Sequence, residues 1–251
     1  MSNTNKFTGK AGLYSKFRPD YPKQLIVDLI TKNNLKKDSI VADIGAGTGR
    51  LTKMLLEHNL QVFAVEPNTE IRQTAVNQLA ANQYFHAING TAEHTTLPDN
   101  SVDFVTVAQA FHWFDHVSFK NEANRILKEN GKVAIISNVR NISAPLNQEI
   151  AKVYQKFCPN FVGFSNGLKD SKEVYDSFFM NGYTETVYDF PISHDKNSFI
   201  GRHLSASYAL NASDTLFPNF VQELSDLFDK YSKNGFLKLP NDTKYRCGNV
   251  G

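Results

Sequence analysis

The sequence has little of what marks membrane, secreted or metal-dependent proteins. Its 251 residues include only two cysteines, Cys158 and Cys247, which lie far apart and match neither a zinc-binding nor a redox spacing. No apolar run reaches 18 residues, so we expect no membrane span. Met1 to Lys10 lack the apolar stretch of a signal peptide. These absences favour a soluble protein in the reducing cytoplasm.

The charge is also nearly balanced. Lys and Arg number 27 against 25 Asp and Glu, for a formal net charge of +2. This balance gives no general reason to bind nucleic acid or an anionic membrane, so we expect neither as a partner. The net charge does not predict the oligomeric state. Aromatic residues reach 12%, which suits an aromatic-lined pocket and a Phe-rich core equally well.

The first half of the chain alternates short apolar runs with helical patterns. The apolar runs predict five strands, and helical spacing begins at Leu51 and recurs over 70–81 and 119–128, where Asn130-Gly131 then marks a turn. Strands that alternate with helices predict an α/β fold with a parallel, Rossmann-like sheet covered on both faces. The five expected strands are 40–44, 62–66, 84–88, 102–107 and 132–137.

The pattern changes after Arg140. We expect a helix over 172–180 and two further strands over 184–192 and 243–250. The remaining segments, 141–171 and the largely helical 195–240, predict a cap formed by insertions. The whole chain, 1–251, is then one domain whose ligand-binding core spans 35–140. On helix 119–128, the charged residues Glu122, Arg125, Lys128 and Glu129 are typical of a solvated face.

The clearest local motif is Asp43-Ile44-Gly45-Ala46-Gly47-Thr48-Gly49, which follows a strand and opens a helix. Glycines allow a sharp turn and bring a ligand close to the main chain, where a helix start offers unpaired N–H groups. The dinucleotide fingerprint G-x-G-x-x-G/A fails, because Arg50 occupies its last position, and no G-K-[ST] follows. A tight turn without a ligand is the simpler alternative.

Acidic and small residues follow the next two strands. Glu66 closes the second strand before Pro67, where a carboxylate can accept hydrogen bonds from ribose hydroxyls. The segment 89–93 follows the third strand and can border an adenine ring. Carboxyl ends of parallel strands share one edge of the sheet, so these pieces predict one nucleotide site.

Together these motifs resemble the class I S-adenosylmethionine-dependent methyltransferases. The resemblance covers roughly 10–138, through the segments 41–50, 63–68, 90–93, 97–105 and the strand from Lys132. Within that family the chain is most similar to the small-molecule, trans-aconitate methyltransferase-like (methyltransferase type 11) group, on Tyr14–Pro22, Gln109–Phe114 and Gly201–Tyr208.

The resemblance implies a seven-stranded sheet of order 3-2-1-4-5-7-6 with the last strand antiparallel, and S-adenosyl-L-methionine as cofactor. It implies that Asp43, Gly45, Ala46 and Gly47 line the methionine part and that Glu66 and Pro67 border the ribose. An aspartate that the family often places at the adenine edge is replaced here by Thr91 or Ala92, so a backbone amide is expected to serve there. The remaining cofactor residues implied are Glu93 and, near the methyl group, Gln109.

Further residues are candidates for chemistry or substrate binding. His112 follows the fourth strand and is the best general-base candidate, although it can equally shape the pocket. Its i, i+4 spacing to His116 lacks a third ligand, so we expect no metal. Trp113, Phe111 and Phe114 either wall the site or pack in the core.

Arginines are suited to binding carboxylates. Arg18 is expected to pair with the cofactor's or an acidic substrate's carboxylate, with Tyr14 and Tyr21 closing the same lid, unless this arm only packs on the surface. Arg202 and His203 are second candidates for substrate anchoring.

The sequence therefore predicts an enzyme that methylates a small molecule at a carboxylate or hydroxyl by in-line displacement. Two alternatives stay open at this point: methylation of a protein or RNA, and a catalytically silent cofactor-binding partner protein.

Overall fold

The computed structural model describes residues 20–164, 172–206 and 208–251. Its contacts divide the chain into two compact units. Unit 1 comprises Met1–Asn138, Ser171–Tyr188 and Thr243–Gly251. Unit 2 comprises Val139–Asp170 and Asp189–Asp242.

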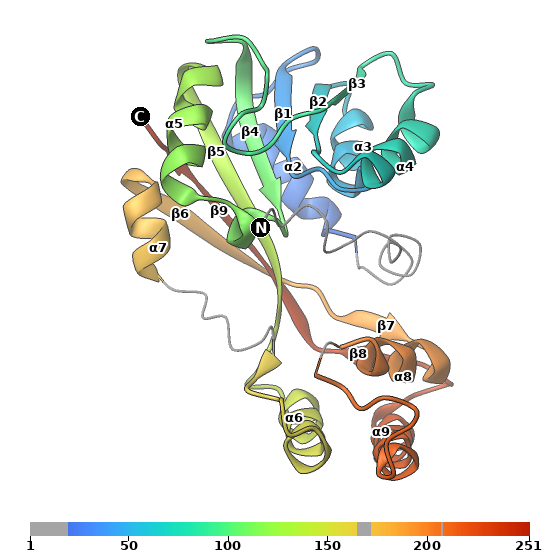
Figure 1. Ribbon diagram of the computed structural model, residues 1–251. Helices are drawn as coiled ribbons and strands as arrows, with labels where there is room; N and C mark the ends of the chain where they lie inside the picture. Colours follow the sequence, from blue (N-terminus) through green and yellow to red (C-terminus); the bar gives the residue numbers. More distant parts are fainter. Residues whose placement is uncertain (1–19, 165–171, 207) are drawn as a thin grey trace. The chain divides into compact units, whose positions relative to one another are not determined.

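A seven-stranded sheet dominates the fold (Figure 1). Its order is β3-β2-β1-β4-β5-β9-β6, mostly parallel with one antiparallel strand, so the last strand of the chain lies between the fifth and sixth. The predicted fold class and strand order are confirmed. The strands are β1 (Ile40–Ile44), β2 (Gln61–Val65), β3 (Phe85–Ile88), β4 (Val102–Ala108), β5 (Leu127–Arg140), β6 (Met180–Asp189) and β9 (Asn241–Asn249).

Helices cover both faces of the sheet, as its apolar strands require. Helices α5 (His116–Ile126) and α7 (Lys172–Phe178) share a core with one face, through Phe119, Ile126 and Phe178. Helices α2 (Lys23–Lys32), α3 (Arg50–Leu56) and α4 (Thr69–Leu79) contribute to the core on the other face (Figure 1). Helix α2 has no counterpart among the predicted elements, although its Leu25, Ile26 and Leu29 have helical spacing.

Three local expectations need correction. The helix expected over 172–180 ends at Phe178, and β6 already begins at Met180, with Asn181 and Gly182 inside the strand at positive φ. Asn130-Gly131 is not a turn before a new strand but an irregularity within β5, where the register with β4 shifts. Glu122 does not belong to a solvated face, since its side chain is buried.

Unit 2 has a core of its own. Helices α6 (Pro145–Phe157), α8 (Lys196–Leu204) and α9 (Phe217–Tyr231) share one apolar cluster with strand β8 (Leu237–Leu239). Strand β8 pairs in antiparallel fashion with β7 (Ile192–His194). The strand at 237–239 lies in a segment expected to be largely helical. Within the described ranges, no helix is long and apolar enough to cross a bilayer. A substrate cap over 141–171 and 195–240 stays a prediction.

Candidate functional site

The glycine-rich loop lies at the carboxyl end of β1, where backbone conformation demands glycine. Gly45 and Gly47 have φ values of +68° and +60°. A Cβ added to Gly45 would lie 2.7 Å from the Cβ of Ala110, so the loop packs directly against the segment after β4. A Cβ added to Gly47 would meet no atom within 4 Å. The main chain at Gly47 is therefore open to a ligand.

Asp43, at the end of β1, holds the base of this loop. Its carboxylate accepts hydrogen bonds from Thr52 Oγ1 at 2.6 Å and from Thr106 Oγ1 at 3.1 Å, and only 1% of the residue is exposed. Burial raises the pKa of Asp43 to about 6, against the opposing effect of both threonines. These bonds tie β1 to α3 and β4 and fix the loop, while a direct contact of Asp43 with a cofactor stays a prediction.

Glu66 follows β2 directly and faces the same loop. Its Oε2 accepts a hydrogen bond from the backbone N–H of Gly47 at 3.1 Å, and its Oε1 accepts one from Asn68 N at 2.9 Å. Arg72 stabilises the turn after β2, because its Nη1 donates hydrogen bonds to the carbonyl oxygens of Glu66 and Pro67 at 2.7 and 3.2 Å. Burial raises the pKa of Glu66. The structure thus brings together the acid and the glycine loop that the sequence assigned to one site.

A carboxylate offers about four acceptor positions, so Glu66 keeps capacity for two further donors such as ribose hydroxyls. With the open main chain at Gly47, these residues fit a ribose-containing cofactor.

The turn after β3 closes on itself. Thr91 N donates to His94 O at 3.0 Å, and His94 N bonds back to Thr91 Oγ1 at 3.1 Å. The side chain of Ala92 is buried in the core, and Glu93 Oε1 accepts a hydrogen bond from Asp115 N at 3.0 Å. Because β3 pairs with β2 in parallel, this turn lies at the same edge of the sheet as Glu66.

The segment after β4 begins with a strained residue. Gln109 has φ +57°, and its Nε2 donates to Asn138 O at 3.0 Å. His112 follows in the short 3₁₀ helix η2 (Phe111–Trp113), where its exposed ring lies 4.8 Å from that of Trp113. Exposure at the carboxyl edge leaves His112 accessible to a substrate.

The three aromatic candidates differ in how much of each residue is exposed. Phe111 is 5% exposed and packs in the core, Phe114 is half-buried and Trp113 is 39% exposed. His116 stacks on Phe111, and its Nε2 lies 3.2 Å from Phe111 O. In the part of the chain that the structure describes, no cluster of three metal-binding side chains occurs.

The other candidates are more scattered. Tyr14 and Arg18 lie outside the described residues, and Tyr21 is buried in the core with residues of α2 and α3, so the lid stays a prediction. Arg202 and His203 lie on α8 in unit 2, and His203 is fully buried.

Comparisons with known proteins agree with this geometry. Residues 42–135 match the model of a methyltransferase domain family. A Dictyostelium discoideum protein named as a methyltransferase is 30% identical over 209 residues, covering 81% of this chain and 77% of that protein. The chain belongs to the class I S-adenosylmethionine-dependent methyltransferases.

One further relative and one solved structure are also similar to this chain. An uncharacterised methyltransferase of Mycobacterium tuberculosis is 40% identical over 134 residues, which is 53% of this chain, and the match spans about half (52%) of that relative's length. A solved methyltransferase structure from Anaeromyxobacter dehalogenans, 20% identical, has a TM-score of 0.58 and covers 93% of this chain and 98% of its own. At that identity it shows a shared fold.

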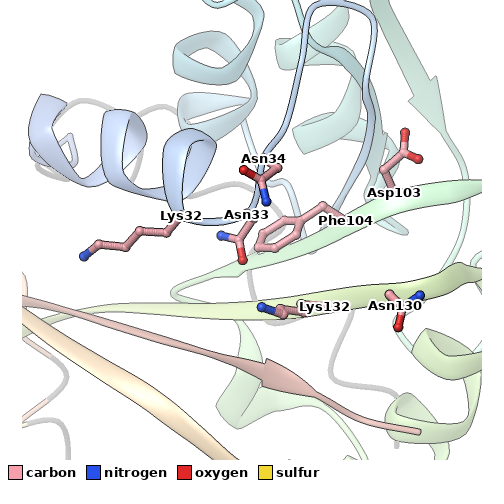
Figure 2. Close-up of a pocket in the computed structure, with 7 residues that line it drawn as sticks. All are labelled: Lys32, Asn33, Asn34, Asp103, Phe104, Asn130 and Lys132. Atoms are coloured by element: carbon pink, nitrogen blue, oxygen red, sulfur yellow. The ribbon is translucent and has the colours of Figure 1, made fainter.

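This methyltransferase also has a cavity of about 300 Å³ away from the site (Figure 2). It lies beside the end of α2 and the start of β4, at the opposite edge of the sheet from Glu66. Its acidic residue, Asp103, already accepts hydrogen bonds from Ile40 N and Lys128 Nζ, at 2.7 and 2.8 Å. The lining residues are Lys32, Asn33, Asn34, Asp103, Phe104, Asn130 and Lys132. This cavity is therefore distant from the candidate site around Gly47 and Glu66.

The side chains that stabilise the segment after β3 were not predicted from the sequence. Glu122 Oε1 accepts hydrogen bonds from Thr95 N and Oγ1 at 2.7 and 2.6 Å, and Arg125 bonds to both Glu122 oxygens. Burial acts to raise the pKa of Glu122, but bonds from Arg125 and Thr95 outweigh it and hold the pKa at about 2. The signal available was that Glu122 shares the buried side of α5 with Phe119, Ala123 and Ile126.

Proposed function

We propose that this methyltransferase uses S-adenosyl-L-methionine to methylate a small molecule at a carboxylate or hydroxyl oxygen. The observation that carries the proposal is the bond between Glu66 and the Gly47 amide, at the carboxyl edge of a parallel sheet. It joins an acid with spare acceptor capacity to a stretch of open main chain.

Different residues would contact each part of the cofactor. Glu66 would accept the ribose hydroxyls, and the main chain of Gly45 to Gly47 would border the methionine part. Ala92 and Glu93 would border the adenine, and Gln109 the reacting end. When bound, the cofactor supplies a sulfonium methyl group as the electrophile. The chain's own task is to hold the acceptor in line and exclude water, which contributes about 7–11 kcal/mol in favourable cases.

The acceptor decides whether a base is needed. A carboxylate, with a pKa of about 4, is already ionised at neutral pH, whereas a hydroxyl must lose its proton. His112 is the exposed candidate base after β4. The balanced net charge supports a small molecule over RNA as the acceptor.

Calorimetry with the full chain tests the cofactor. We expect S-adenosylmethionine to bind and NAD to bind weakly or not at all. Glu66→Gln should weaken S-adenosylmethionine binding by about 10- to 100-fold, the equivalent of one charged hydrogen bond of 1.5–3 kcal/mol. Glu129→Gln is the matched control, because Glu129 is exposed in the same unit. Tighter binding of NAD, or equal S-adenosylmethionine affinity in both variants, would refute the proposal.

A screen over small acids, phenols and amines, with formation of S-adenosylhomocysteine as the readout, identifies the acceptor. Turnover with a small acid or phenol supports methyl transfer to oxygen. Turnover only with amines, only with protein or RNA, or none at all despite tight cofactor binding, contradicts it.

A further inference from the structure

Unit 2 contains a buried group of cationic and imidazole side chains that the proposed cofactor site does not use. Arg140 ends β5, His194 ends β7, and Arg202 and His203 lie in the last turn of α8. His203 is fully buried and His194 is 5% exposed. Three elements, β5, β7 and α8, thus contribute two arginines and two imidazoles to this group.

Tyr154 of α6 joins these segments. Its hydroxyl lies 2.9 Å from both His203 Nδ1 and His203 O. Its ring packs edge-on against those of Phe164 and Tyr208, with centroids 6.2 and 4.9 Å away. The Arg140 guanidinium in turn lies over Phe164, with 4.3 Å from Cζ to the ring centre. Arg140 and His203 therefore flank one aromatic cluster.

Three buried nitrogen atoms of this group have no hydrogen-bond partner among the residues that the structure describes. They are Arg140 Nη1, His194 Nε2 and His203 Nε2. Buried polar groups are almost always hydrogen-bonded, and each orphaned group costs about 1–3 kcal/mol, more when it is charged. Three such atoms around one cluster indicate an incomplete site rather than a packing accident.

The bonds of Tyr154 fix the tautomer of His203. A carbonyl oxygen only accepts, so the Tyr154 hydroxyl proton is donated to His203 O. Nδ1 of His203 must then donate to the Tyr154 oxygen. In the neutral ring, Nε2 consequently carries a bare lone pair, and it becomes a donor only when the ring takes up a proton.

The charge of Arg140 is not balanced by the other described residues of the cluster. Among the described residues, no ion pair joins Arg140 to a carboxylate. The carboxylate that acts on His194 is Asp195, and its Oδ1 already accepts the Ser198 N–H at the start of α8. A buried water could fill hydrogen bonds here, but it would leave the charge of the Arg140 guanidinium uncompensated. An oxyanion satisfies both needs.

We propose that unit 2 encloses a binding site for a carboxylate or phosphate group, with Arg140 Nη1 as the principal donor and His194 and His203 beside it. This inference rests on the proposed function in one respect, since it assigns that oxyanion to the methyl acceptor. The acceptor is then a small acid, anchored through a group that the cationic cluster neutralises.

Binding of the anion takes up protons. Burial, together with the charges of Arg202 and Arg140, lowers the pKa of His194 to about 4. Burial and the same two arginines also hold the pKa of His203 well below its ordinary value, so both rings are neutral at pH 7. An anion reverses this repulsion and raises both pKa values. The titratable or charged groups around the two rings are Arg140, Arg202, Tyr154, Tyr208 and Asp195.

The test is calorimetric titration of the full chain without cofactor, using malonate and inorganic phosphate as separate probes. We expect one of the two to bind at a single site, and Arg140→Met to weaken it by at least about 10-fold, as the loss of a charge-assisted hydrogen bond requires. Lys152→Met is the control, because it removes an exposed cation from the same unit and should change the affinity less than twofold. The probe that binds identifies the oxyanion.

Folding and proton uptake are checked on the same samples. Arg140→Met should melt no lower than the wild type, since it removes an unpaired buried charge. Should it fail to fold, His203→Gln replaces it and should weaken the probe by a similar factor. The wild type should take up protons on binding, measured as a binding enthalpy that varies with the ionisation enthalpy of the buffer.

Three results would overturn the inference: no binding of either probe, equal binding by wild type and Arg140→Met, or equal losses in Arg140→Met and Lys152→Met. Titration with S-adenosylmethionine runs beside these experiments. Cofactor binding without probe binding defeats this inference alone, whereas probe binding without cofactor binding defeats the proposed function alone.

Discussion

The buried carboxyl of Asp43 should make unit 1 less stable as the pH rises from 4 to 7. In the folded state its pKa is about 6, because burial disfavours the charged form. In the unfolded chain the pKa is near the ordinary 3.8. Between these values the folded state binds more protons than the unfolded state, so the free energy of unfolding falls with rising pH.

The size of the effect follows from the shift. A difference of one pKa unit corresponds to about 1.4 kcal/mol, so the rise from 3.8 to about 6 corresponds to about 3 kcal/mol when complete. Because Asp43 is already partly ionised in the unfolded chain at pH 4, about 2–3 kcal/mol of this falls between pH 4 and pH 7. The stabilisation is fully present below pH 3.8 and is lost as the pH passes through 6.

Comparison with Asp43→Asn isolates this contribution. Asparagine resembles the neutral acid and does not titrate, so the difference in unfolding free energy between variant and wild type should shift by about 2–3 kcal/mol in favour of the variant from pH 4 to 7. Other acids cancel in the difference. Glu122, whose pKa is held at about 2, acts in a lower window, since its stabilisation is lost only as the pH falls below 4.5.

Urea unfolding at several pH values gives these free energies. Trp113, the only tryptophan, lies in unit 1, so its fluorescence reports on the unit that contains Asp43. Asp38→Asn is the control, because Asp38 is exposed in the same unit. A difference between Asp43→Asn and wild type that stays constant from pH 4 to 7 would refute the reasoning about burial.

Two further predictions concern the loop and the base. Gly45→Ala should destabilise unit 1 by more than about 2 kcal/mol in urea unfolding, because its Cβ would collide with Ala110, whereas Gly47→Ala should cost only about 1 kcal/mol of backbone strain yet weaken S-adenosylmethionine binding. Equal losses of stability in the two variants would contradict the open main chain at Gly47. His112→Ala should lower turnover of a hydroxyl acceptor by about 100-fold or more and leave both cofactor affinity and carboxylate turnover nearly unchanged. A loss with both acceptors would assign His112 a role other than general base.

Much of unit 1 could be predicted because its signals are local. Each of the first four strands is a short apolar run, and the candidate residues Gly47 and Glu66 follow strand ends directly, so the parallel sheet brings Glu66 to Gly47. The partners of Asp43 were not predictable in the same way. Thr106 faces Asp43 because β1 and β4 pair in one register, and a sequence pattern does not specify that register.

Burial of polar residues was the other point at which pattern reasoning failed. Glu122 was expected in solvent because glutamate usually is, yet α5 turns it inward beside Phe119. His203 is a candidate for substrate anchoring because it lies in Gly201–Tyr208, a segment that resembles the family. Its buried neighbours Arg140 and His194 have no local signature, because they come from different elements of unit 2.

The two units handle buried charge in opposite ways, and this difference bears on function. In unit 1 the buried acids Asp43 and Glu122 accept hydrogen bonds from threonines, and Glu122 also from Arg125, so their carboxylate oxygens have partners without a ligand. In unit 2 the Nη1 of Arg140 is buried without a partner. A buried unpaired charge lowers stability unless a ligand binds it. An anion that binds only the folded form should therefore raise the melting temperature of wild type more than that of Arg140→Met, and the gap should widen with anion concentration.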